Sequence, residues 1–248
     1  MARLLSTPVR LSMLARSKLT AIITLSVALG SLAYVLLLSD GRAAEDLLGV
    51  HIVILAIALN VILVSGVIVP DMNGGAAALW LQRPVKAVPY YLTQWLMAFT
   101  VATAVTCVIV LLGTLADTHF IGTHAMSQEL SRLPAVLLVG FVAAAICFAV
   151  SAWVPKGSAL VAIAVLLVGG AIDDELAIRS DIMEPILSAI LRAVVYPQNP
   201  LADISDFTVG EGAFPWLGMV RIVLYTGACM AVGCLGIHRL TTRKGLVY

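Results

Sequence analysis

The side chains that could carry out chemistry in this chain are few, and the most reactive of them lie between long apolar runs. His119 and His124 stand close together, with Asp117 and Glu129 nearby, and these residue types can bind zinc. A metal site needs three or four converging ligands, and this spacing of two histidines is not diagnostic of one. A membrane enzyme built on these residues is one hypothesis. We expect instead that the chain is not an enzyme and holds no metal.

The apolar runs themselves contain few polar groups. Charged residues inside membrane spans usually mark ion or proton pathways, because charge is costly there, yet no Asp, Glu, Lys or Arg lies in the middle of a run. His51, Asn60 and Gln94 are the polar candidates. A helix–helix hydrogen bond is the expected role of each, and Asn60 and Gln94 could alternatively line a translocation path.

The sequence contains no phosphate-binding loop of the G-x-x-x-x-G-K-[ST] type. If the chain moves something against a gradient, another polypeptide must therefore supply the energy. The net charge of +1 gives no reason to expect a nucleic-acid partner.

Composition indicates a membrane protein. Of the 248 residues, 61% are hydrophobic and 12% are charged, whereas soluble domains are about 45–50% apolar and about 25% charged. A span needs about 20 mostly apolar residues. We therefore predict an all-α, polytopic membrane protein, one transmembrane domain over residues 1–248. The six predicted spans are Leu19–Leu38, Leu47–Val69, Leu92–Leu115, Leu133–Val154, Ser158–Ile172 and Trp216–His238.

Charge is distributed unevenly between the two ends of these spans. Ten basic residues and one acid, Asp71, fall at the termini, in the 70–91 loop and in the 155–157 turn. The opposite side carries the other 13 acids and four basic residues, with Arg221 just inside the last span, from which it can extend to the outer surface. Because basic residues concentrate in cytoplasmic segments, both termini are predicted to be cytoplasmic.

Residues 173–215 are predicted to form an external region. The fifth span has 15 residues, which is short for a crossing, and the sequence after it predicts a helix over residues 181–195 with an apolar stripe that includes Ile186, Ile190 and Val194. That helix could dip into the membrane as an outer gate or lie flat at the interface. Pro197, Pro200 and Pro215 are predicted to break the connection that follows.

Two cytoplasmic segments complete the prediction. Residues 1–18 are basic with interleaved apolar side chains, which is typical of an interfacial helix. In the 70–91 loop, Asp71 or Asn73 could cap a short helix over residues 75–82, which Arg83-Pro84 would end. Its Leu79 and Trp80 could dock on a partner or rest on lipid headgroups.

The loop resembles that of the permease subunits of ABC-2 type transporters. Those permeases have six spans, cytoplasmic termini, a basic interfacial helix before the first span, and external re-entrant helices after a short fifth span. In their second loop an acid and a glycine precede a stretch like Leu79 to Lys86, which here reads Leu-Trp-Leu-Gln-Arg-Pro-Val-Lys. The loop departs from the family where Met72 and Asn73 stand at positions that are often acidic.

The resemblance implies a function as well as a fold. It implies a subunit of an ATP-driven exporter in a bacterial inner membrane, with two permease copies, a homodimer, bound to a separate ATPase that holds ATP and Mg²⁺. The coupling residues would be Asp71, Asn73, Gly75, Leu79, Trp80, Arg83 and Pro84. A membrane scaffold or assembly factor that transports nothing is the alternative, since it too needs no charge within its spans.

Overall fold

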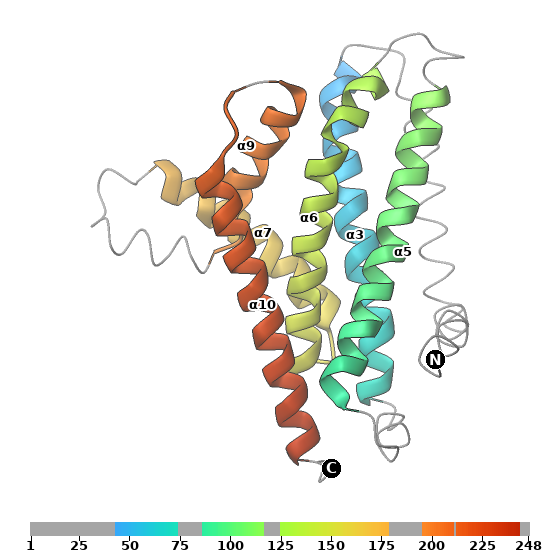
Figure 1. The fold of residues 1–248 in the computed structure, drawn as a ribbon, viewed down its shortest axis with the longest axis vertical. Helices are drawn as coiled ribbons and strands as arrows, with labels where there is room; N and C mark the ends of the chain where they lie inside the picture. The colour runs from blue at the N-terminus through green and yellow to red at the C-terminus, as the bar shows by residue number, and fades with distance from the viewer. Residues whose placement is uncertain (1–42, 74–85, 117–124, 179–194, 211, 244–248) are drawn as a thin grey trace.

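The computed structural model describes residues 43–73, 86–116, 125–178, 195–210 and 212–243. In this part of the chain every regular element is an α-helix, which confirms the predicted all-α class for these residues. The helices are α3 (Ala43–Asn73), α5 (Ala87–Ala116), α6 (Ala125–Trp153), α7 (Ser158–Ile178), α9 (Gln198–Val209) and α10 (Trp216–Arg243). Figure 1 shows the longer helices running side by side along the molecule, with α9 at one end.

Three of these helices are long and apolar enough to cross a membrane, by length and composition. They contain the segments Ala87–Leu112, Leu130–Trp153 and Trp216–Leu240, of 26, 24 and 25 residues, and a crossing takes about 20. Two shorter apolar segments, His51–Gly66 and Ser158–Asp173, belong to α3 and α7. These features agree with a membrane protein, and the count of six spans stays a prediction.

Helix α6 is the centre of the bundle. It contacts each of the other described helices, and its middle, from Val142 to Phe148, is almost entirely inaccessible. This stretch is rich in alanine, and small residues let membrane helices approach closely. On the α5 side, the Trp95 indole Nε1 donates a 3.0 Å hydrogen bond to the Ala144 carbonyl, and the Trp95 ring meets Phe148 edge to face.

Helix α10 packs on another face of α6 through glycines. A Cβ added to Gly233 would collide with the Phe148 ring, and one added to Gly236 would lie 2.8 Å from the Trp153 Nε1 atom. The Trp153 indole also donates a 2.9 Å hydrogen bond to the Val232 carbonyl. The two helices are therefore joined closely near the end where both finish.

Several element boundaries differ from the sequence prediction. Helix α3 continues to Asn73 and α5 begins at Ala87, so both edges of the predicted 70–91 loop are helical. Helix α6 begins at Ala125, eight residues before the predicted span. The predicted break at Pro200 is wrong, because Gln198–Val209 forms α9, with Pro200 in its first turn, where the missing N–H costs nothing. Pro197 and Pro215 do lie outside helices, directly before α9 and α10.

Several sequence predictions lie outside the described residues. They are the N-terminal helix over residues 1–18, the span Leu19–Leu38, the short helix over residues 75–82 with Gly75, Leu79, Trp80, Arg83 and Pro84, the loop residues Asp117, His119 and His124, and the stripe residues Ile186, Ile190 and Val194.

Candidate functional site

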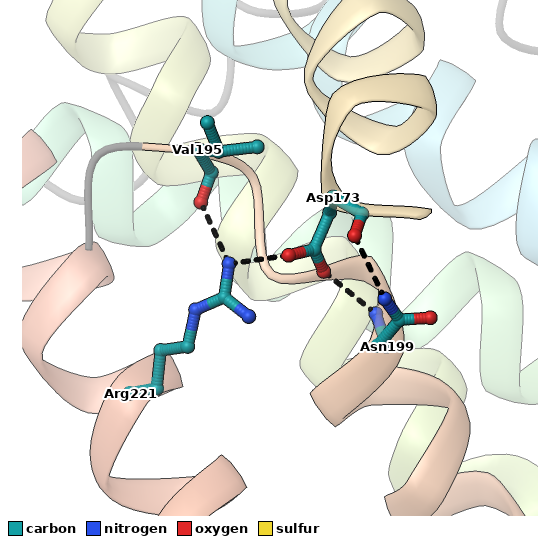
Figure 2. A network of polar contacts seen from close by, with 4 residues as sticks. All are labelled: Asp173, Val195, Asn199 and Arg221. Carbon is teal, nitrogen blue, oxygen red and sulfur yellow. Dashed lines mark hydrogen bonds and ion pairs between the residues drawn. The ribbon is translucent and has the colours of Figure 1, made fainter. Parts of the chain in front are cut away.

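A buried ion pair joins α7 to α10 at the end of the bundle that carries α9. Asp173 lies at the end of the apolar part of α7, and Arg221 lies about a turn and a half into α10. The Arg221 Nη2 atom is 2.7 Å from the Asp173 Oδ1 atom. The same Nη2 donates a longer bond, 3.5 Å, to the Val195 carbonyl. Figure 2 shows the guanidinium pointing between the carboxylate and this carbonyl.

The second carboxylate oxygen of Asp173 holds the first turn of α9. The Asn199 backbone N–H donates a 3.0 Å hydrogen bond to Asp173 Oδ2, and the Asn199 Nδ2 donates a 3.2 Å bond to the Asp173 carbonyl. The N-cap position of α9 is Pro197, which makes no side-chain capping bond. Asp173 therefore supplies from another helix the acceptor and the negative charge that a helix N-terminus favours.

The Asp173–Arg221 pair is buried, so its carboxylate must be compensated by a partner charge and by hydrogen bonds. The Asp173 side chain is 1% exposed and the Arg221 side chain 19% exposed. A carboxylate at this depth is tolerated only with a partner charge and hydrogen bonds to its oxygens, and Asp173 has both. The neighbouring Tyr196 is also buried, and burial raises the pKa of its phenol, so it stays neutral beside the pair.

Glycines let the segment before α9 approach α7. A Cβ added to Gly169 would lie 2.8 Å from the Tyr196 Cβ, and one added to Gly170 would collide with the Gln198 side-chain amide. On the α10 side, a Cβ added to Gly218 would lie 3.1 Å from the Pro200 Cβ. The segment is thus seated against small residues of both helices. We call Asp173, Asn199, Arg221 and the Val195 carbonyl the outer junction.

Sequence reasoning missed most of the outer junction. It placed Arg221 just inside the last span and expected its side chain to extend to the surface alone. The structure corrects this, because the guanidinium is paired with Asp173 inside the molecule. A signal was present in the sequence, because an acid closes a short apolar run and a base lies near the start of the last apolar run. Nothing in the sequence indicated Asn199.

The two predicted path residues lie away from the outer junction. Asn60 is 2% exposed and Gln94 is 5% exposed, so neighbouring helices cover both. The Asn60 Nδ2 donates to the Ala56 carbonyl of its own helix at 2.8 Å, whereas its Oδ1 has no hydrogen-bond partner in the described part of the chain. A path that includes these side chains would require helices to separate.

The predicted coupling residues fall partly within the described structure. Asp71 lies in the last turn of α3, and Asn73 is its final residue. Whether either residue caps the predicted helix over residues 75–82 stays a prediction, because that helix lies outside the described residues.

Among the residues that the structure describes, no group of three or more His, Cys, Asp or Glu side chains is placed to hold a metal ion. The four cysteines are free thiols, and Cys147 is fully buried, with its Sγ 3.5 Å from the Val61 carbonyl. Comparisons with protein-family models, with curated proteins and with solved structures found no match to this chain.

Proposed function

We propose that this chain is the transmembrane permease subunit of an ATP-driven, ABC-type transporter, working as an exporter. Two copies would pair with a separate ATPase in a bacterial inner membrane, and that ATPase would hold the ATP and Mg²⁺. The observation that supports the proposal is that α3 ends and α5 begins at the same end of the bundle, and the sequence between them resembles an ABC-2 coupling loop.

The ends of the described helices locate this segment. Helix α3 finishes and α5 begins at the end of the bundle where α10 also finishes (Figure 1). Lys86, Lys156 and Arg239 are exposed at this end. Most of the described acids lie at the other end, together with Arg132 and Arg221; these acids are Glu45, Asp46, Glu129, Asp173, Asp174, Glu175, Asp203 and Asp206. By the preference of basic residues for the cytoplasm, we propose that the end with Asp71 and Lys86, which flank residues 74–85, faces the cytoplasm.

The position of Asp71 supports a partner with positive charge. The last turn of a helix carries partial negative charge, so an acid there is unfavourable by about 0.3–1 kcal/mol. Helix α3 has no basic residue in its last turn to offset it. A basic group on an ATPase surface would relieve this repulsion, which gives Asp71 a physical reason to contact such a partner.

The proposal is tested by isolating the full-length tagged chain from its native membrane. We expect a P-loop ATPase to co-purify in a fixed ratio, and we expect Trp80→Asp to reduce the amount bound without changing membrane insertion. Lys156→Asp is the matched control, because it also changes charge at the same end of the bundle. It should keep the ATPase bound.

Two results would count against a permease. Absence of any P-loop ATPase from the native complex would favour the scaffold function. An unchanged amount of ATPase bound to Trp80→Asp would remove the 71–86 segment as the docking site.

A further inference from the structure

We infer that residues 195–209 form a cap that opens as a unit from the outer end of the bundle, with the Asp173–Arg221 pair as the latch that holds it closed. The cap consists of the Val195–Pro197 segment and α9. The inference concerns the fold of this chain, and it goes beyond the proposed function because it holds whether or not an ATPase drives the movement.

The latch lies at the N-terminal end of the cap. Every polar contact in Figure 2 between the cap and the neighbouring helices involves Asp173 or Arg221. Asp173 binds Arg221 through one oxygen and the Asn199 N–H through the other. Loss of this one carboxylate would therefore remove the ion pair between α7 and α10 and the acceptor of the Asn199 N–H.

The opposite end of the cap is built as a hinge. Gly210 and Gly212 adopt left-handed backbone angles, with φ of +93° and +79°, and a Cβ at either position would meet nothing within 4 Å. Glycine is the residue that adopts such angles most readily. Beyond the glycines, the Phe214 ring contacts Phe207 at 5.1 Å and Trp216 at 4.5 Å between ring centroids. These contacts hold the C-terminal end of α9 to the start of α10.

The cap meets α7 and the core through different kinds of contact. On α7 it rests on Gly169 and Gly170, which have no side chains that interlock with it. Its Tyr196, Leu201 and Ile204 side chains are buried in the hydrophobic core, and α9 also packs against α6, whereas Asp203 and Asp206 are exposed. Opening must therefore separate these three side chains from the core as well as break the ion pair.

An ion pair also suits a latch better than apolar packing would. Apolar side chains of similar volume often stabilise a buried contact as well as a charge pair does. The charge-assisted hydrogen bonds of the pair add a dependence on geometry, because hydrogen bonds weaken steeply when donor and acceptor are misaligned. The outer junction should therefore have two states, closed and open, and few between.

The inference is tested by hydrogen exchange, followed by mass spectrometry, on the full-length protein in lipid nanodiscs. In Asp173→Asn and in Arg221→Gln, we expect the amides of residues 198–209 to exchange at least tenfold faster than in the unchanged protein. The amides of α6 should exchange at the same rate as before. Asp203→Asn is the matched control, since it removes an exposed acid from α9 outside the junction, and it should leave the cap unchanged.

A disulfide gives a second measurement, in which the cap is held closed instead of released. The added Cβ of Gly169 lies 2.8 Å from the Tyr196 Cβ, so the two positions must move apart by about 1 Å to reach the 3.5–4.5 Å found in disulfides. In a background without the four native cysteines, Gly169→Cys with Tyr196→Cys should, when oxidised, slow exchange in the cap at least tenfold. A reductant should reverse the effect.

Three outcomes would overturn the inference. In the first, exchange in the cap is the same in both junction variants as in the unchanged protein. In the second, faster exchange spreads equally into α6 and α10, which makes the pair a brace of the whole bundle. In the third, the formed disulfide leaves exchange in the cap unchanged. None of these bears on ATPase binding, so the proposed function is tested separately.

Discussion

Breaking the Asp173–Arg221 pair should be among the most destabilising changes available in the described part of this protein. Removal of one partner of a buried pair typically costs about 3–5 kcal/mol, because the other charge stays buried without compensation. Here the carboxylate is 1% exposed, and the guanidinium is 19% exposed and so retains partial access to its surroundings. Arg221→Gln, which strands the more deeply buried charge, should therefore destabilise more than Asp173→Asn.

The magnitude can be checked against the electrostatic attraction. Two unit charges about 4 Å apart in an effective dielectric of about 20 attract by about 4 kcal/mol. The desolvation of both groups offsets part of this. A double variant, Asp173→Asn with Arg221→Gln, buries no charge at all. It should be less destabilised than the sum of the two single variants, with a coupling energy of at least about 1.5 kcal/mol.

The measurement is reversible unfolding of the purified protein in mixed micelles, with helix content as the signal. Asp203→Asn serves as the control, since it removes an exposed acid and should shift stability by less than about 0.5 kcal/mol. Coupling of less than about 0.5 kcal/mol between positions 173 and 221 would refute the view that the pair acts as a buried unit. Equal stability of Arg221→Gln and the unchanged protein would refute it as well.

Three further predictions concern the packing of α6, each measured by unfolding in the same micelles. Gly236→Ala should destabilise by about 1–3 kcal/mol, because its Cβ would meet the Trp153 indole at 2.8 Å, whereas Gly227→Ala, with nothing within 4 Å, should be neutral or slightly stabilising; equal effects would contradict the close α6–α10 contact. Gly140→Ala places a Cβ 2.7 Å from the Asn60 Nδ2 and should destabilise the protein, and adding Asn60→Ala should restore most of the loss; a further loss in the double variant would show that Asn60 is not the obstructing group. Trp153→Phe should cost about 1 kcal/mol through loss of its 2.9 Å bond to the Val232 carbonyl, and no change would mean that this bond adds nothing to the association of α6 and α10.

The sequence was sufficient to predict most of the helices but not where they end. Apolar runs predicted α5, α7 and α10 because lipid-facing and core-facing residues are both apolar in a membrane bundle. A helix can continue for several polar residues beyond its apolar part, and hydropathy does not detect these residues. For this reason α6 begins at Ala125 and α7 continues to Ile178, beyond the predicted spans.

The positions of the prolines around α9 are compatible with a helix. Its prolines suggested a break, but Pro200 lies in the first turn, where a proline fits well. Leu201 and Ile204 are spaced for one helix face, and Gly210 follows as a left-handed C-cap. The outer junction is harder to predict from the sequence, because Asp173 and Arg221 are 48 residues apart. Their pairing depends on the angle at which α7 meets α10, which no local pattern encodes.

The depth of the pair explains why Arg221 is not free at the surface. Trp216 begins α10 and is 73% exposed, and tryptophan at the end of a span favours the boundary between lipid and water. Arg221 follows five residues later, about 7.5 Å along the helix at 1.5 Å per residue. An arginine at that depth could reach water by extending towards the surface, but the Arg221 guanidinium is instead bonded to Asp173 and to the Val195 carbonyl. Asp173 is the anion available on the near side of the cap, so burial of the arginine and closure of the cap require each other. The strength of the latch should thus depend on the lipid around it. When the cap opens, Asp173 and Arg221 each lose their charged partner, and lipid cannot replace that partner.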